Sequence, residues 1–156
     1  MELNIFGKPL IPCCSDPMTG YFRDGFCRTI SEDTGTHTVC ALVTKAFLTY
    51  SASRGNDLMT PIPHWNFPGL QPGDKWCLCI SRWLEAEKAG KAPPIILEAT
   101  HQKSLQYASL ELLQQYDSDK HSRSYLIDAL AINAAIYTDI IAAFKETYKY
   151  TYPTKK

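Results

Sequence analysis

Two cysteines separated by one residue are the first feature of this sequence that could carry chemistry. Cys77 and Cys79 flank Leu78 in an apolar run. In a strand, residues two apart point to the same face, with Cα atoms roughly 6.6 Å apart and parallel Cβ vectors. A disulfide between the two would be strained, whereas binding one metal, or two separate partners across a sheet, suits this geometry. The structural alternative is a pair of buried, reduced thiols in the core.

A third cysteine, Cys40, follows shortly after His37 in the sequence. If the strand that carries Cys40 pairs with the later cysteine strand, Cys40 would face Cys77 or Cys79, and His37 would join them at the start of its strand. Three cysteines and one histidine are a common zinc ligand set. Buried reduced thiols, or a redox pair that includes Cys40, are the alternatives. The predicted zinc ligands are Cys40, Cys77, Cys79 and His37.

Polar residues in loops and at element ends form a second group of candidates, because binding and catalytic residues concentrate there. A histidine acts as a general base near neutral pH, and an arginine binds carboxylates and other anions. The same residue types also serve as turn formers, caps and ion-pair partners. Asp33 occupies such a loop position but is assigned no role. The catalytic candidates are His37, Asp57, Glu98 and His101, and the candidates for substrate binding are Arg23, Asp24, Asn56 and Arg82.

Charge and motifs exclude several function classes. Lys plus Arg and Asp plus Glu each number 16, so the net charge is zero and general binding of nucleic acid is not expected. The sequence has no nucleophile elbow, phosphate-binding loop, dinucleotide fingerprint or His-Glu-x-x-His helix. The catalytic motifs with the clearest sequence signatures are therefore missing.

The cellular compartment bears on the six cysteines. No basic segment followed by a long apolar stretch opens the chain, so we expect no export signal and a cytoplasmic location. The most apolar later stretch, residues 129–138, is too short to span a bilayer, so we expect no membrane insertion. A reducing cytoplasm disfavours persistent disulfides, and the thiols are expected to be core residues, metal ligands or reactive groups.

The strands and helices that must position these residues indicate a mixed α+β domain. Strands are predicted at 38–43, 75–80 and 94–98, and the turn residues Asp24-Gly25 predict a hairpin; a single helix over 38–54 is the alternative to the first strand and the helix after it. Helices are predicted at 45–54 after Thr44, at 82–89 after Ser81, and in short stretches after Thr100 and Ser109. A proline-rich, ordered loop is predicted at 56–74. The expected fold is a compact two-layer α+β domain with a small sheet, short helices and long ordered loops, over residues 1–116.

The C-terminal part of the chain reads differently. Residues 117–124 are polar and predict a linker, and residues 149–156 predict a frayed tail. Between them, apolar residues recur at helical spacing over 125–148, which predicts an appended amphipathic helix. Its apolar stripe must pack on the body or on another chain, so a homodimer through this helix is one hypothesis.

Taken together, several segments make the chain resemble a mainly bacterial family of domains of unknown function, numbered 2237. The matching segments include IPCCSDPMTGYFRDGFC, DTGTHTVCALVT, FPGLQPGDKWCLC and PPIILEATH, within residues 4–116. The resemblance implies a compact α+β domain and cysteines in these contexts at 13, 27, 40, 77 and 79, and it implies no activity. The sequence favours a small intracellular module with a zinc or thiol site. The alternatives are a small-molecule enzyme and a protein-interaction domain.

Overall fold

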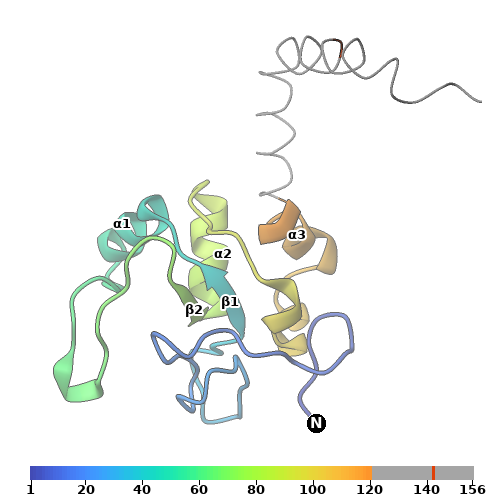
Figure 1. The fold of residues 1–156 in the computed structure, drawn as a ribbon, viewed down its shortest axis with the longest axis horizontal. Coiled ribbons are helices and arrows are strands. Elements are labelled where there is room, and N and C mark those ends of the chain that lie inside the picture. Colours follow the sequence, from blue (N-terminus) through green and yellow to red (C-terminus); the bar gives the residue numbers. More distant parts are fainter. Residues whose placement is uncertain (121–141, 143–156) are drawn as a thin grey trace, which may run out of the picture. The chain divides into compact units, whose positions relative to one another are not determined.

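The computed structural model describes residues 1–120 and Ala142. Contacts between Cα atoms separate a unit Met1–His121 from a unit Ser122–Lys156, and the first unit carries all the elements described below. It is the predicted compact α+β domain, with one small antiparallel sheet and a few short helices (Figure 1). The predicted helix 125–148, the tail 149–156 and most of the predicted linker lie outside the described residues. No helix in the described part is long and apolar enough to cross a membrane.

The sheet consists of two antiparallel strands, β1 (Val39–Leu42) and β2 (Lys75–Leu78). Both lie inside predicted strands, and their apolar and β-branched side chains are almost all buried. The register places Cys40 directly opposite Cys77, as one of the two predicted pairings required. Two buried threonine side chains cover the strand edges: Thr100 Oγ1 accepts the N–H of Cys40, and Thr19 Oγ1 accepts that of Cys77. These bonds satisfy backbone groups that would otherwise be buried without a partner.

The predicted third strand at 94–98 does not form as such. Its residues run beside β1, where Ile96 donates its N–H to Cys40 O and Leu42 donates to Pro94 O. Only Ile95 makes bridges, one to Ala41 and one to Asp117. Leu97–Ala99 then turns into a 3₁₀ helix, η2, because Thr100 directs its hydroxyl back to Ile96 O. Asp117 and the next residue are therefore still bonded to the domain, although the predicted linker begins there.

Helix α1 (Lys45–Ser53) begins where predicted. Thr44 is its N-cap and accepts the N–H of Phe47 at 3.1 Å. Its buried side chains Phe47 and Leu48 are 1% exposed and join the main core beside the sheet. The helix ends before Gly55, whose φ of +82° suits a residue without a Cβ.

Helix α2 (Ile80–Lys88) begins two residues earlier than predicted, directly after β2. Its N-cap is Cys79, not Ser81, so Cys79 is not the last residue of a strand. The expectation that Cys77 and Cys79 share one strand face is therefore wrong. The tertiary structure favours the early start because Ile80 and Trp83 are then buried in the core.

The remaining helices are short. Helix α3 (Leu110–Gln114) is capped by Ser109, as predicted, which accepts the N–H of Leu112. The 3₁₀ helix η3 (Gln102–Gln106) is capped by His101, one residue after the predicted cap. In the loop 56–74, η1 (Pro63–Trp65) lies at the far end of the green segment that extends away from the sheet (Figure 1). Phe67 anchors that loop through an edge-to-face contact with Trp76, at 5.1 Å between ring centroids.

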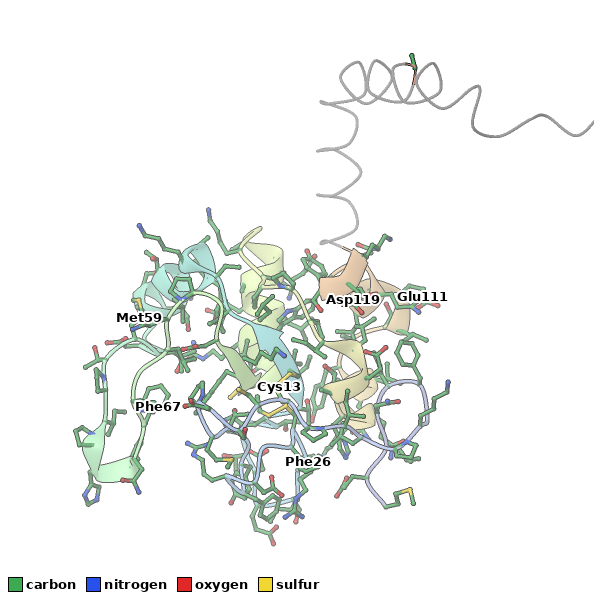
Figure 2. All side chains as sticks on the ribbon, in the orientation of Figure 1. Cys13, Phe26, Met59, Phe67, Glu111 and Asp119 are labelled. Carbon is green, nitrogen blue, oxygen red and sulfur yellow. A yellow bond between two sulfur atoms is a disulfide. The ribbon has the colours of Figure 1, made fainter. Side chains whose placement is uncertain are left out.

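The first 38 residues contain turns and isolated bridges but no strand or helix. The hairpin predicted at Asp24-Gly25 is absent, because Gly25 donates its N–H to Thr19 O and Asp24 caps the N–H of Phe26. Two disulfides hold this segment to the sheet: Cys13–Cys40 and Cys27–Cys77. They appear as yellow bonds near the label of Cys13 in Figure 2. All four cysteines are buried, and they form a small second core with Ala99.

The expectation that the thiols are reduced is therefore wrong for four of the six cysteines. Cys14 and Cys79 are free and half-buried. The disulfides close sequence separations of 27 and 50 residues. By the chain-entropy estimate, each would stabilise the fold by about 3.5 to 4 kcal/mol. The N-terminal segment has no strand of its own that pairs with the sheet, so the two disulfides join it to β1 and β2 covalently.

Candidate functional site

The free thiol of Cys79 lies next to the imidazole of His37. A hydrogen bond with Cys79 is the largest cause that raises the pKa of His37 to about 9, and the charges of Cys79 and Asp33 act in the same direction. Burial of the ring opposes this shift but does not outweigh it. The imidazole is thus held in its protonated form at neutral pH, beside a cysteine sulfur.

The other side of the imidazole is fixed by Asp33. The Asp33 Oδ1 to His37 Nδ1 distance is 2.6 Å, and Oδ2 accepts the His37 backbone N–H and the Thr29 hydroxyl, both at 2.9 Å. Burial raises the pKa of the Asp33 carboxyl, but the hydrogen bonds from His37 and Thr29 more than compensate, so that this pKa lies below its usual value. Because Nδ1 is engaged by Asp33, Nε2 is the ring nitrogen that remains available to another group.

A tight loop brings the aspartate and the histidine together. Thr36 donates its N–H to Asp33 O and has a φ of +50°, which turns the chain back towards Asp33. The carbonyl of Thr36 accepts the N–H of Ile80, the first residue of α2, and this bond joins the loop to the segment that carries Cys79. One backbone hydrogen bond thus sets the histidine loop against the cysteine.

Gly35 lies against both reactive side chains. A Cβ at this position would be 2.6 Å from His37 Cε1 and 2.9 Å from Cys79 Sγ. Contacts under 3.0 Å are essentially never observed for a real Cβ, so any side chain here would displace the imidazole or the sulfur. The requirement for glycine is one of space and not of backbone conformation.

The N-terminus of α2 adds an electrostatic feature. Cys79 is the N-cap of this helix but makes no side-chain capping bond. The first N–H groups of a helix have no partner within it and carry partial positive charge. That of Ile80 is bonded to Thr36 O, and those of Ser81 and Arg82 occupy the positions that an N-cap side chain normally reaches.

His37 also lines a cavity of about 210 Å³ on the side of the loop 56–74. Two candidates for substrate binding, Arg23 and Asn56, and one catalytic candidate, Asp57, contribute to the same cavity. The ring of Tyr21 stacks near His37, at 6.4 Å between centroids. The rest of the lining is apolar and aromatic: Leu58, Ile62, Trp65, Phe67 and Trp76.

The predicted zinc ligand set does not assemble in this structure. Cys40 is bonded to Cys13 and Cys77 to Cys27, and a disulfide sulfur offers no thiolate to a metal. Two members of the set, His37 and Cys79, do lie close together, on either side of Gly35. A different trio, Cys13, Cys27 and Cys77, has ligand atoms within 4.8 Å of one another.

The other candidates lie outside this site. Both ring nitrogens of His101 are used, by Glu2 and by the N–H of Lys103, so this histidine is a helix cap. Arg82 is paired with Glu85, and Asp24 with Arg28. The Glu98 side chain is exposed on η2, and only its backbone carbonyl has described bonds.

Asp33 is the residue of this site to which the sequence alone assigned no role. Its signal was the segment Asp33-Thr-Gly-Thr-His37, in which the acid and the histidine are four residues apart around a glycine. The spacing alone does not distinguish a pair that closes a turn from two exposed side chains. The 4% exposure of Asp33 decides it, because a buried carboxylate needs hydrogen-bonding partners.

A comparison with known families covers this whole site. The family model described as "Uncharacterized protein conserved in bacteria (DUF2237)" matches residues 3–117. The match includes Asp33, His37 and Cys79 and confirms the resemblance found over residues 4–116. No curated protein matches the chain.

Proposed function

The chain belongs to the DUF2237 family, and we propose that it is an enzyme that uses Cys79 as a nucleophile. In this proposal His37 exchanges protons with the reacting groups, and Asp33 orients the imidazole through Nδ1. The observation that carries the proposal is the 2.6 Å bond from Asp33 Oδ1 to His37 Nδ1, on an imidazole that lies beside the Cys79 sulfur across Gly35. Cysteine is a common nucleophile in covalent catalysis, and a histidine beside its sulfur is the usual partner.

The chemistry that best fits these groups is acyl transfer or hydrolysis. The Cys79 sulfur attacks the carbonyl carbon of an ester, thioester or amide, and an S–C bond forms as the carbonyl π electrons move to oxygen. In this proposal the N–H groups of Ser81 and Arg82, in the first turn of α2 after Cys79, would stabilise that oxyanion. When the carbonyl re-forms, the bond to the leaving group breaks, and the leaving group takes the proton from His37 Nε2. Water, deprotonated by His37, then releases the acyl group and restores the thiolate.

The alternative role for these three residues is structural, since a buried aspartate and a histidine can simply close a turn. Two features favour the catalytic role. Cys79 and His37 are both half-buried, so reagents can reach them, and His37 also lines a cavity. Paired titratable groups with a shifted pKa beside a cavity are typical of functional sites.

The test compares two free cysteines of the same protein. Cys14 and Cys79 are both half-buried and outside the disulfides, so Cys14 is an internal control. The protein is treated with limiting iodoacetamide at pH 7, and the labelling rate of each cysteine is followed by peptide mass spectrometry. We expect Cys79 to react roughly tenfold or more faster than Cys14, because the protonated imidazole of His37 lies beside Cys79. A p-nitrophenyl acetate reaction on Cys14→Ser protein should also leave an acetyl group on Cys79.

Equal labelling rates, together with no acetyl adduct on Cys79, would contradict the proposal. If Cys79 is fast but a mild peroxide, and no acyl donor, modifies it, the site is a redox thiol and the acyl-transfer chemistry is wrong. His37→Gln separates these effects further, since it should slow both alkylation and acetylation of Cys79 and leave Cys14 unchanged.

A metal site is a second candidate function, supported by the close approach of Cys13, Cys27 and Cys77. With Cys40 bonded to Cys13, four buried cysteines meet at the sheet. If a cellular dithiol reduces both disulfides, four thiols result, and loss of their protons would give a set of four thiolates, which is a common zinc ligand set. This proposal keeps zinc as the metal but changes the ligands from the predicted set to Cys13, Cys27, Cys40 and Cys77.

Elemental analysis of protein purified with reductant and without chelator tests this second candidate. About one zinc per chain, lost in a Cys27→Ser/Cys77→Ser variant and retained in Cys79→Ser, would support it. Reduced protein without zinc, or zinc that depends on Cys79, would overturn it.

Two further predictions from the sequence stay proposals: a cytoplasmic location and a homodimer through residues 125–148. Trapping thiols with a maleimide in intact cells tests the first, since a cytoplasmic protein is expected to carry reduced cysteines. Sedimentation of the full chain and of a chain ending after Lys120 tests the second. The cut is placed there because residues 117–118 still bond to Ile95. Identical monomers would contradict the dimer.

A further inference from the structure

The cavity beside His37 combines aromatic walls with positive charge. Phe67 and Trp76 are buried at its base, at 7% and 6% exposure, whereas Trp65 is 66% exposed and lines it from the loop 56–74. An exposed tryptophan beside a cavity offers a flat apolar surface that folding has not used. At about 210 Å³ the cavity is smaller than the sites that hold drug-sized ligands. It therefore suits a small molecule or one end of a longer one.

Arg23 is the charged group of this cavity. Its guanidinium lies over the indole of Trp76, at 5.0 Å from the ring centroid, and Nη1 donates to Gly20 O at 2.7 Å. Arg23 also has a φ of +53°, a conformation that residues other than glycine rarely adopt. Among residues 1–120, no carboxylate forms an ion pair with it. The arginine is thus held in place without a counter-charge.

The acidic residue of the cavity does not supply that counter-charge. Asp57 Oδ1 accepts the N–H groups of Met59 and Thr60, and Oδ2 accepts the Thr60 hydroxyl at 2.5 Å. These bonds close the turn at 57–60, which is the structural role considered for Asp57 in the sequence. Asp57 keeps its charge, but its oxygens are used within this turn, so Arg23 remains a cation without an ion-pair partner beside the aromatic wall.

We infer that the substrate of the proposed Cys79 enzyme carries an organic anion of the carboxylate type attached to a small flat apolar group. Arg23 binds the anion, and the apolar group packs against Trp65 and Phe67. A planar guanidinium matches the two oxygens of a carboxylate, and stacking on Trp76 already orients it. This inference rests on the proposed function, because it names the substrate class of the same site.

An isosteric pair of probes tests the inference through protection of Cys79. Phenylacetate and phenylacetamide have the same ring and nearly the same shape, but only the first is an anion. Each is titrated against the rate of Cys79 alkylation by iodoacetamide in the full chain. We expect phenylacetate to protect at a concentration at least about tenfold lower than phenylacetamide, as a hydrogen-bonded charge typically contributes that much. Arg23→Gln should remove the difference.

Arg28→Gln is the matched control. Arg28 also lies over an aromatic ring, that of Phe22 at 3.9 Å, but it is paired with Asp24 and does not line this cavity. This variant should keep the preference for phenylacetate. Trp65→Ala should weaken protection by both probes, and because Trp65 is exposed, this substitution removes no packing from the core.

The outcomes separate the inference from the proposed function. If Cys79 reacts no faster than Cys14, the proposed function fails. If Cys79 is fast but the two probes protect equally, or neither protects, only the inferred substrate class is overturned. Retention of the preference in Arg23→Gln would assign anion binding to another group and would also overturn it.

Discussion

Asp33 and His37 are four residues apart on one loop, and the carboxylate of the first fixes the imidazole of the second at 2.6 Å between Oδ1 and Nδ1. The carboxylate is 4% exposed, whereas the histidine is half-buried and faces Cys79. An interior acid thus holds a partly accessible base, and the base contacts the thiol. In the proposed enzyme the buried Asp33 would orient the histidine, and the more accessible His37 and Cys79 would transfer protons and attack the substrate.

Asp33→Asn should slow alkylation of Cys79 by roughly tenfold, corresponding to about 1.4 kcal/mol, because the amide removes the negative charge that favours protonated His37. The amide must also accept from both Thr29 and the His37 N–H, so the free energy of unfolding should fall by about 1 to 3 kcal/mol. Iodoacetamide labelling and urea denaturation measure the two effects. Asp74→Asn is the control, since Asp74 only caps the N–H of Gln71. Normal Cys79 labelling in Asp33→Asn would show that the carboxylate has no role in the thiol chemistry.

Gly35→Ala should separate His37 from Cys79, because the new methyl would lie within 2.9 Å of both side chains. We expect the fast labelling of Cys79 to fall to the rate of Cys14. Gly55→Ala provides the comparison: its Cβ would meet nothing within 4 Å, and only its positive φ is unfavourable. That variant should lose about 1 kcal/mol of stability and keep fast labelling. If Gly35→Ala reacted normally, the close packing of the three residues would be irrelevant to reactivity.

The stability of the fold should depend on pH through His37. Its pKa is raised from 6.5 to about 9 in the folded protein, mainly by the hydrogen bond with Cys79. Protonated His37 therefore contributes fully below pH 6.5, and this contribution is lost as the pH rises to about 9. Urea midpoints measured across this range should fall for the parent protein relative to His37→Gln. His64→Gln, at an exposed position in η1, should follow the parent. Parallel curves for the parent and His37→Gln would contradict the raised pKa.

The disulfides should dominate the stability of the N-terminal segment. Oxidised, unfolded protein should show two free thiols, and reduced protein six. By the chain-entropy estimate, Cys13→Ser/Cys40→Ser and Cys27→Ser/Cys77→Ser should each lose about 3.5 to 4 kcal/mol of unfolding free energy. Cys14→Ser should change little, since Cys14 is outside both disulfides. Six free thiols in unreduced protein would contradict the pairing and favour the zinc candidate instead.

Much of the central framework could be predicted from local patterns. The apolar runs around Cys40 and Cys77 predicted the two strands, and Thr44 and Ser109 predicted two helix starts through their capping side chains. These signals are local, because strand alternation and N-cap hydrogen bonds involve residues only a few positions apart. The family resemblance, which depends on sequence alone, is also confirmed.

Tertiary packing decided what local patterns left open. The sequence predicted Cys79 as a strand residue. In the structure α2 begins directly after it, because Ile80 and Trp83 are then buried in the core, and Cys79 lies at the N-terminus of this helix. The partners of Cys40 and Cys77 come from the turn-rich segment at Cys13 and Cys27, and no periodicity specifies such long-range pairs.

The sequence by itself thus determined the α+β class, the two strands of the sheet, the starts of α1 and α3, and the residue types available for chemistry. Only the tertiary structure decided which of those residues meet. Candidates such as His101 and Arg82 have their side chains engaged by Glu2 and Glu85, whereas Asp33, His37 and Cys79 converge across 46 residues of chain through the hydrogen bond from Ile80 to Thr36. The physical reason is that side-chain convergence depends on long-range packing and loop closure, which leave little trace in local sequence.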